Sequence, residues 1–326
     1  MGEFELIDRF FRRDRPASRQ VALGIGDDCA LLAPAPGMQL AVSSDMLLEG
    51  RHFLSTVDPA RLGHKALAVN LSDLAACGAR PLGFTLSLAL PAVDESWLAG
   101  FAGGLFALAD EHGCELVGGD TTRGPLAISI TVFGEVPPGQ ALLRSGARDG
   151  DDLYASGTLG DARLALEVFR GGLAVPAPLF ELARRRMEQP TPRVALGQAL
   201  RGIASSAVDV SDGLLGDLGH VLRRSQVGAT IWAASALPLL AAREQADGVA
   251  GLPEATQLEF VLAGGDDYEL VFTAPAAQRE AVAAAAAASA TPVTRIGRIE
   301  AQPGVRLLDG EDRELRGRFA SFDHFA

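Results

Sequence analysis

The feature that most constrains this chain is a recurring junction, in which an apolar stretch typical of a β-strand ends in small residues followed by an aspartate. It occurs in "LAVSSD", which ends at Asp45, in "LVGGD", which ends at Asp120, and in "SAVDVSD", which ends at Asp212. In α/β proteins, binding sites assemble where strands end, because the strand fixes a residue's position and the loop leaves room for a ligand. The pattern therefore favours a mixed α/β protein with a carboxylate-rich site.

Helical and strand patterns alternate through the first 136 residues. Residues 3–11 place apolar side chains on one helical face, and residues 59–77 predict a helix with a proline near its start and Gly78 just after its end. A second long helix is expected at 94–113. Strands are expected at 38–47, 82–90, 114–119 and 126–136, and the regular alternation of 82–90 predicts an antiparallel, half-buried strand.

The stretch 138–152 is rich in proline, glycine and charge, and it predicts a linker between an N-terminal domain, 1–137, and a C-terminal α/β domain, 153–326. In the second domain, helices are expected near 160–170, 178–188, 193–204, 213–225 and 276–289. Strands are expected at 153–157, 206–211, 269–274, 293–300 and 304–309. The whole chain therefore predicts two α+β or α/β domains.

A faint internal similarity links the two halves. "AVNLSDL" (68–74) and "AVDVSDG" (207–213) align without gaps as A-V-[N/D]-x-S-D. So short a match arises easily by chance. It is also what two domains arranged around one shared site would show.

Composition excludes several classes of function. The formal net charge of −12 argues against nucleic acid as a partner. The N-terminus lacks a signal-peptide pattern, and no apolar run approaches the roughly 20 residues that a membrane span needs, so a cytoplasmic protein is expected. The three cysteines, Cys29, Cys77 and Cys114, show no CxxC spacing, which predicts buried thiols in a reducing compartment.

The set of aspartates carries the chemical signal. Each aspartate alone is an ordinary N-cap or turn residue. Two carboxylates at about 4 Å repel by roughly 4 kcal/mol at an effective dielectric constant near 20, so several in one cleft require a cation. Oxygen donors without clustered His or Cys favour Mg²⁺, and Mg²⁺ held by a few carboxylates is typical of phosphate-handling sites. The sequence thus favours phosphoryl transfer, although Walker A, HRD and DFG motifs are absent.

Other candidates for such a site are few. The glycines of "GGDTTRG" offer backbone amides to a phosphate, and Arg144 and Arg148 offer guanidinium groups, unless these arginines are simply solvated linker charges. His52 follows the Asp45 strand by one turn and could reach the same cleft. No Ser-His-Asp or Cys-His arrangement can be defended from the spacing.

Several long motifs resemble one known family. The chain contains, in order, "GIGDDCA", "KALAVNLSDLAACGARP", "GGDTTRGPL", "RSGA", "DVSDGLLGDLGH", "GGDDYEL" and the terminal "FDHF". Together they look like the thiamine-monophosphate kinase family, and the resemblance runs from "FELI" to the last residues. It implies a two-domain fold of the aminoimidazole-ribonucleotide-synthetase type, with N-terminal strands that form a barrel across a homodimer.

The resemblance also implies an activity. ATP and thiamine monophosphate would give thiamine diphosphate and ADP by direct transfer, with ATP as co-substrate and several Mg²⁺ ions as cofactors. This is the last step of thiamine diphosphate synthesis. The closest alternative is another ATP-using enzyme of this fold that activates an amide or selenide oxygen, and a different class of alternative is a non-catalytic divalent-ion-binding protein.

Roles are carried over motif by motif. The metal ligands implied are Asp28, Ser43, Ser44, Asp45, Asp73, Asp120, Asp209 and Asp212, and of these Asp45, Asp73, Asp120 and Asp209 would be catalytic. ATP would contact Gly119, Asp120, Arg144 and Ser211. Thiamine monophosphate would contact His52, Asp266 and Phe322.

Two positions depart from the family's pattern. The family usually has "GGED" where this chain has "GGDD", so Asp266 is one methylene shorter and its reach to the substrate is in question. Ser44 occupies the second position of an "STD"-type motif and keeps the hydroxyl. In "GIGDDCA", Asp28 is the expected ligand, and Asp27 is expected to be a turn former.

Overall fold

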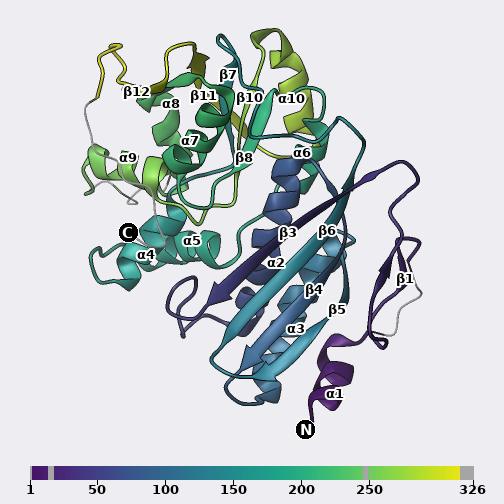
Figure 1. Ribbon diagram of the computed structural model, residues 1–326. Helices are drawn as coiled ribbons and strands as arrows, with labels where there is room; N and C mark the ends of the chain where they lie inside the picture. The colour runs from purple at the N-terminus through teal and green to yellow at the C-terminus, as the bar shows by residue number, and fades with distance from the viewer. Residues whose placement is uncertain (1, 14–17, 245–248, 250, 316–326) are drawn as a thin grey trace. The chain divides into compact units, whose positions relative to one another are not determined.

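The computed structural model describes residues 2–13, 18–244, 249 and 251–315, and the chain divides into two compact units. The first comprises Met1–Leu74 and Ala79–Ala141, and the second comprises Ala75–Gly78 and Leu142–Ala326. Figure 1 shows that each unit combines helices with a sheet. The expected two-domain α/β fold is confirmed.

The first unit is built on a four-stranded sheet with the strand order β3-β6-β4-β5. Its strands are β3 (Gln39–Leu48), β4 (Arg80–Leu90), β5 (Glu115–Arg123) and β6 (Ala127–Val136). β6 pairs antiparallel with β3 and with β4. β4 and β5 are parallel, and α3 (Glu95–Glu111) forms the crossover between them. β3 and β5 therefore form the two edges of this sheet.

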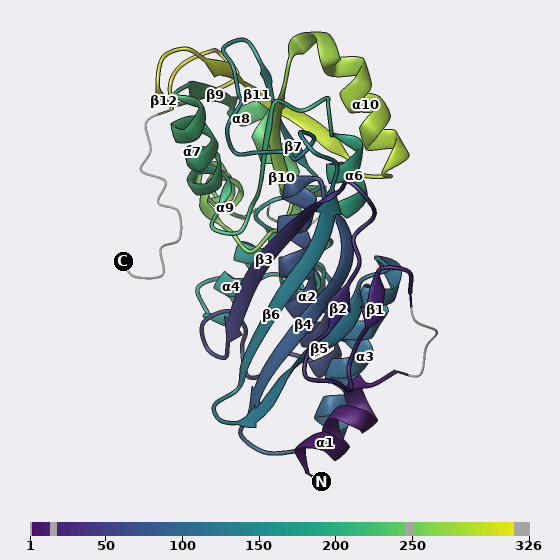
Figure 2. The same cartoon turned by 45° about the vertical axis from the view of Figure 1, so that its right-hand side comes forward.

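Helices cover one face of this sheet. Figures 1 and 2 both show α2 (Pro59–Cys77) and α3 behind its strands. Alternate residues of β4 are buried, among them Phe84 and Leu86, as the sequence pattern predicts. Along β3, in contrast, the side chains of one face are exposed, and four of them are apolar, namely Leu40, Val42, Met46 and Leu48. The sheet thus has one buried face and one face that is apolar and exposed at β3.

The long helices begin and end where the sequence predicts. The Asp58 carboxylate accepts hydrogen bonds from the backbone N–H groups of Ala60 and Arg61 at the start of α2, and Gly78 adopts a φ of +70° after its end. At α3, the Asp94 carboxylate accepts from two backbone N–H groups of the first turn. Residues 59–77 are helical as expected, so the position of Asp73 on α2 follows from the sequence.

The N-terminal segment carries the motif "GIGDDCA" in a hairpin loop. The helix expected at 3–11 is present as α1 (Glu3–Leu6) followed by a π-helical turn, η1 (Ile7–Phe11). β1 (Val21–Leu23) and β2 (Leu31–Leu32) then pair antiparallel, and residues 24–30 connect them. The two adjacent aspartates of the motif therefore lie at the tip of a hairpin and are exposed.

The second unit contains a six-stranded sheet with the order β12-β9-β11-β7-β10-β8. β12 pairs parallel with β9, and the other neighbouring pairs are antiparallel. The strands are β7 (Asp152–Ser156), β8 (Ser206–Asp209), β9 (Gly228–Trp232), β10 (Leu270–Ala274), β11 (Val293–Glu300) and β12 (Gly304–Leu308). The α-helices are α4 (Asp161–Phe169), α5 (Ala177–Glu188), α6 (Val194–Ala199), α7 (Leu214–Ser225), α8 (Ala233–Ala236), α9 (Glu254–Ala263) and α10 (Arg279–Ala288). The short 3₁₀ turns are η2 (Leu237–Leu239), η3 (Ala241–Glu244) and η4 (Ala276–Gln278).

Some elements differ from the prediction. The helix expected near 193–204 ends at Ala199, because the chain turns there and Gly202 adopts a φ of +73°. β5 continues past Gly119 to Arg123. β9 was not predicted; four of its five residues are buried, so the strand shows no alternation of apolar and polar residues. α9 was also missed, since six of its ten residues are buried and its apolar residues do not form one clear face.

Two expectations from composition have different outcomes. Cys114 is buried and Cys77 is half-buried, but Cys29 is exposed in the hairpin loop, so the expectation of buried thiols is wrong for Cys29. Of the helices that the structure describes, none combines the length and the hydrophobicity that a membrane span requires.

Candidate active site

In the first unit, β3 and α2 bring together Ser43, Asp45 and Asp73. The Ser43 hydroxyl donates a hydrogen bond of 2.5 Å to Oδ2 of Asp73. The backbone N–H of Asp45 donates to Oδ1 of Asn70 at 3.1 Å, and Asn70 lies one turn before Asp73 on α2. Three of the expected metal ligands are therefore neighbours in the structure.

The electrostatics of this group suit a cation. Burial and, to a smaller extent, the charge of Asp73 together raise the pKa of the Asp45 carboxyl to about 6. Two carboxylates that repel each other beside a hydroxyl form an all-oxygen donor set, which is the kind that Mg²⁺ prefers. The residues present therefore fit a magnesium ion.

Ser44 and His52 have other contacts. The Ser44 hydroxyl donates to the backbone carbonyl of Ile130 at 3.1 Å and lies 3.0 Å from the hydroxyl of Thr131, so it contacts β6. In the turn after β3, Nδ1 of His52 accepts from the backbone N–H of Leu48 at 2.9 Å. This bond makes Nδ1 the acceptor, which leaves the proton on Nε2 when the ring is neutral.

A second group lies at the other edge of the sheet, around β5. A cavity of about 670 Å³ is lined by the hairpin loop with Asp27 and Asp28, and by β5 with Gly119 and Asp120. Within the loop, Oδ1 of Asp27 accepts from the backbone N–H of Asp28 at 2.8 Å, as expected of a turn former. The cavity thus unites two motifs that are about 90 residues apart in the sequence.

Gly119 is required where β5 approaches β4. Its φ is +146°, and a Cβ at this position would lie 1.8 Å from the backbone carbonyl oxygen of Leu86. Any side chain would therefore clash with the neighbouring strand. The glycine preceding Asp120 is explained by this close approach of the two backbones.

The register of the sheet separates the two groups. Asp45 on β3 is level with Gly119 on β5, through Ile130 on β6 and Leu86 on β4. Three strand spacings of about 4.8 Å place the backbones of Asp45 and Asp120 roughly 14 Å apart. Asp45 and Asp120 therefore lie at opposite edges of one sheet.

In the second unit, the motifs "DVSDGLLGD" and "GGDDYEL" lie side by side. β8 ends at Asp209, which is buried, and pairs with β10 at Leu270. Beyond the strands, the backbone N–H of Asp266 donates to the carbonyl oxygen of Ser211 at 2.8 Å. Asp212 follows Ser211 directly, so the structure gathers four expected site residues here: Asp209, Ser211, Asp212 and Asp266.

Asp217 holds this loop in place. Its Oδ2 accepts hydrogen bonds from the backbone N–H groups of Ser211 and Asp212, each at 3.0 Å. Burial raises the pKa of Asp217 to about 7. The sequence analysis did not assign Asp217 a role, although its position in the first turn of α7 is one that favours a carboxylate.

Arg144 belongs to the same region. It is exposed, and its charge lowers the pKa of Asp217 and also that of His220, whose pKa falls mainly through burial. Asp212 acts on His220 in the opposite direction. The Arg144 guanidinium is therefore near enough to Asp217 and His220 for its charge to act on both.

Among the residues that it describes, the structure does not gather the whole expected set into one cluster. Phe322 and the "FDHF" motif lie outside the described residues. Across residues 2–13, 18–244, 249 and 251–315, no three His, Cys, Asp or Glu side chains lie close enough to hold a metal ion. In each unit, the carboxylates therefore occur in pairs or small groups and do not form one complete cluster.

Known proteins resemble this chain in sequence over both units. Residues 26–136 match the N-terminal domain of AIR synthase related proteins, and residues 148–310 match the C-terminal domain. The chain is 46% identical over 329 residues to the thiamine-monophosphate kinase of Escherichia coli (strain K12), covering 100% of this chain and 98% of that protein.

Solved structures agree. The thiamine-monophosphate kinase from Stenotrophomonas maltophilia K279a is 47% identical, with a TM-score of 0.81 over 93% of this chain and 94% of that one. AaThiL, solved in a complex with AMPPCP and TMP, is 29% identical, with a TM-score of 0.72 over 90% of this chain and 89% of that one. This chain therefore belongs to the thiamine-monophosphate kinase family, among the AIR synthase related proteins.

Proposed function

We propose that this protein is a thiamine-monophosphate kinase. A phosphate oxygen of thiamine monophosphate attacks the γ-phosphorus of ATP, a new O–P bond forms, and the bond to the β,γ-bridging oxygen breaks to give thiamine diphosphate and ADP. The observation that carries this proposal is the 46% identity to the Escherichia coli enzyme over all of this chain. The AaThiL complex with AMPPCP and TMP supports the same pair of substrates.

The chain's own residues would align the two phosphates. We infer that Gly119, Asp120, Arg144 and Ser211 contact ATP, with the Arg144 guanidinium pairing with phosphate oxygens. His52, Asp266 and Phe322 would contact thiamine monophosphate. The attacking oxygen is already anionic, so alignment matters more than a general base.

Magnesium would occupy the carboxylate groups. The ligands proposed are Asp28, Ser43, Ser44, Asp45, Asp73, Asp120, Asp209 and Asp212. Bound Mg²⁺ supplies neutralisation of the phosphate charge. The pKa of Asp45 is raised by burial first and by the charge of Asp73 second, and a buried carboxylate beside a second one is the property of this structure that supports a cation there.

We further propose that the protein acts as a homodimer, with the strands of the first unit closing a barrel across the two-fold axis. β3 is an edge strand, and it exposes an apolar stripe, Leu40, Val42, Met46 and Leu48, that a second copy would bury. In one chain, Asp45 and Asp120 lie at opposite edges of the sheet. A second copy seated at β3 offers its own Asp120 to the Asp45 group, which would complete the metal site. Because ATP is a substrate, we place the enzyme in the cytoplasm.

The test is product formation. Purified protein with Mg²⁺, ATP and thiamine monophosphate should yield thiamine diphosphate, resolved by chromatography, and EDTA should abolish it. Free thiamine is the control substrate and should not be phosphorylated; if it is, the role of the substrate phosphate in the site is wrong. Light scattering should give twice the 34.0 kDa chain mass at micromolar concentration, and a mass near 34.0 kDa would contradict the dimer.

A further inference from the structure

In the loop that precedes β10, residues 266–269 are alternately half-buried and buried. Asp267 and Glu269 are buried, at 3% and 0% exposure, whereas Asp266 and Tyr268 are half-buried. Asp267 and Glu269 are therefore enclosed within the second unit, whereas Asp266 and Tyr268 remain partly accessible to a ligand.

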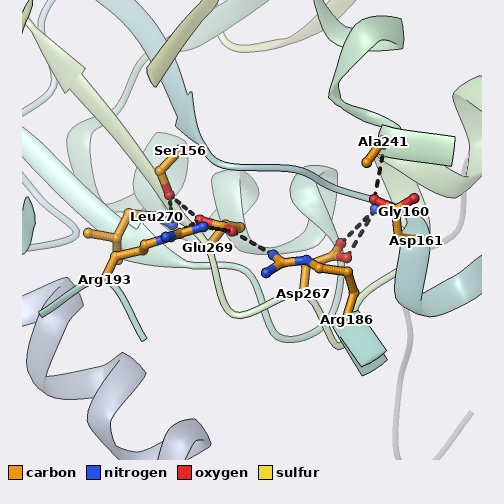
Figure 3. A network of polar contacts seen from close by, with 9 residues as sticks. All are labelled: Ser156, Gly160, Asp161, Arg186, Arg193, Ala241, Asp267, Glu269 and Leu270. Atoms are coloured by element: carbon orange, nitrogen blue, oxygen red, sulfur yellow. Dashed lines mark hydrogen bonds and ion pairs between the residues drawn. The ribbon is translucent and has the colours of Figure 1, made fainter. Parts of the chain in front are cut away.

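Glu269 is fixed by four strong hydrogen bonds, which Figure 3 shows together. Its carboxylate accepts from the Ser156 hydroxyl, from Nη2 of Arg186, and from Nε and Nη2 of Arg193, each at 2.6 Å. Bonds between ionised partners are stronger than neutral ones, and a guanidinium with two bonds also fixes orientation. The position of Glu269 is therefore set by α5, α6's N-terminal flank and β7.

Asp267 is fixed from another element. Both of its carboxylate oxygens accept from the backbone N–H of Gly160, at 3.0 and 3.1 Å, just before α4 (Figure 3). Arg186 lies close enough to lower the pKa of Asp267, against a larger effect of burial in the opposite direction. The two buried carboxylates thus anchor the loop at every second residue.

The residue that precedes each anchor has an unfavourable backbone conformation. Asp266 has a φ of +63° and Tyr268 a φ of +54°, in the left-handed region that non-glycine residues rarely adopt. For a tyrosine this conformation is costly, and such strain concentrates at ligand-binding sites when the surroundings enforce it. Here the surroundings that enforce it are the hydrogen bonds of Asp267 and Glu269.

The strained pair is held beside the expected nucleotide loop. The backbone N–H of Asp266 donates to the carbonyl oxygen of Ser211, and the backbone N–H of Tyr268 donates to the carbonyl oxygen of Val210, both at 2.8 Å. Gly265 permits this approach, because a Cβ there would lie 2.8 Å from the Ser211 carbonyl oxygen. The backbones of Asp266 and Tyr268 are therefore held against the loop of Val210 and Ser211.

We propose that Tyr268 is a further substrate-binding residue, and that its ring and the Asp266 carboxylate together receive the positively charged aromatic ring of the phosphate acceptor. This inference rests on the proposed function, because thiamine monophosphate carries a thiazolium cation. An aromatic face beside a carboxylate suits such a cation. Asp267, Glu269 and Arg193 act through the loop and are positioning residues.

Tyr268→Leu tests the ring, since leucine has the same difficulty with a left-handed φ but no aromatic face. With Mg-ATP saturating, its KM for thiamine monophosphate should rise about tenfold, while its KM for ATP stays within about twofold of the parent's. Calorimetric binding of thiamine monophosphate with Mg²⁺, without turnover, should weaken by the same factor. Tyr268→Phe keeps the ring and should behave like the parent.

Arg193→Lys tests the anchor, because lysine keeps the charge but loses the two-bond fork. It should raise the KM for thiamine monophosphate about threefold and leave the KM for ATP unchanged. An unchanged KM for thiamine monophosphate would overturn the positioning role.

The outcomes distinguish a failure of the proposed function from a failure of the role proposed for Tyr268. A parent protein that forms no thiamine diphosphate overturns the proposed function. An active parent whose Tyr268→Leu variant keeps both KM values overturns this inference alone. A rise in the KM for ATP instead assigns the ring to the nucleotide and also overturns it.

Discussion

The strings "AVNLSDL" (68–74) and "AVDVSDG" (207–213) agree at four positions, yet they fold differently. The first lies inside α2, and the second forms β8 and the loop after it. They are therefore not a structural repeat, and the similarity does not reflect two copies of one site. What they share is a serine and an aspartate, Ser72–Asp73 and Ser211–Asp212, at places where a carboxylate is expected to bind metal.

The neighbours decide between helix and strand. In α2, the string is flanked by helix-forming residues between Asp58 and Gly78, and Leu74 packs in the core at 1% exposure. At the aligned position, Gly213 adopts a φ of +111°, outside both helix and strand geometry, and is the N-cap of α7. The hydrogen bonds that hold the two aspartates differ as well. The Asp73 carboxylate accepts from the Ser43 hydroxyl of β3, whereas the backbone N–H of Asp212 donates to the Asp217 carboxylate.

The largest expected effect concerns activity. Asp73→Asn and Asp212→Asn each remove one charge from a proposed metal group, and we expect turnover with Mg-ATP to fall by more than about 100-fold in both. Asp27→Asn is the control: its carboxylate serves the turn of the hairpin loop, so turnover should fall by less than about threefold. Equal losses at Asp27 and Asp28 would mean that the assignment within "GIGDDCA" is wrong.

The next largest effect concerns stability, at Leu74 and Gly213, the last pair of positions in the two aligned strings. Leu74→Ala should lower the free energy of unfolding by roughly 2–5 kcal/mol, because it leaves a cavity in the core. Gly213→Ala should lower it by about 1–3 kcal/mol, because alanine must adopt a left-handed φ and its Cβ would meet the Ala263 backbone 3.0 Å away. Denaturant titration measures both. A neutral Gly213→Ala would show that the loop needs no glycine, and the contrast between the two strings would then lie elsewhere.

Much of the fold could be predicted from local pattern. Residues 59–77 and β3 follow from apolar periodicity and from Pro and Gly at their ends, and these elements place Asp45 and Asp73. The pairing of "DVSDG" with "GGDDYEL" could not be predicted in this way, since it depends on strand order between β8 and β10. The same holds for the separation of Asp45 from Asp120, which only the register of four strands reveals.

Residues that act through others are also invisible to motif reading. Asp217, Arg186 and Arg193 look like ordinary charged residues of helices, and their roles appear only when a buried carboxylate or backbone N–H is found beside them. The left-handed φ values of Asp266 and Tyr268 have no sequence signal at all. Tertiary contacts decide each of these features.

The raised pKa values of Asp45 and Asp217 predict how the stability of the metal-free protein changes with pH. Because the pKa values of Asp45 and Asp217 are raised, to about 6 and about 7, the folded state binds protons more tightly than the unfolded state, whose value is near 3.8. Their stabilising contribution is present below pH 3.8 and is lost as pH rises through 6 for Asp45 and through 7 for Asp217.

Melting temperatures in EDTA between pH 5 and pH 8 test this sign. Relative to the parent, Asp45→Asn should gain in melting temperature as pH rises from 5, and the gain should level off above about pH 6. Asp217→Asn should show the same trend about one unit higher. A difference from the parent that stays constant with pH would contradict the raised values.

The smallest expected effect is a reversal at Asp73. In metal-free protein, the repulsion between Asp45 and Asp73 opposes folding by on the order of 1 kcal/mol after screening. Asp73→Asn removes that charge and keeps the side chain's shape, including an oxygen that can accept from Ser43, so in EDTA the variant should melt no lower than the parent and up to a few degrees higher. With Mg²⁺ and ATP the order should reverse, because the parent is stabilised by ligand binding that the variant has lost. Were Asp73 only a structural partner of Ser43 between β3 and α2, the variant would melt lower than the parent by the same amount in both conditions. Melting curves of both proteins in EDTA and in Mg-ATP therefore distinguish a metal ligand on a helix from a hydrogen-bond acceptor that merely joins a helix to a strand.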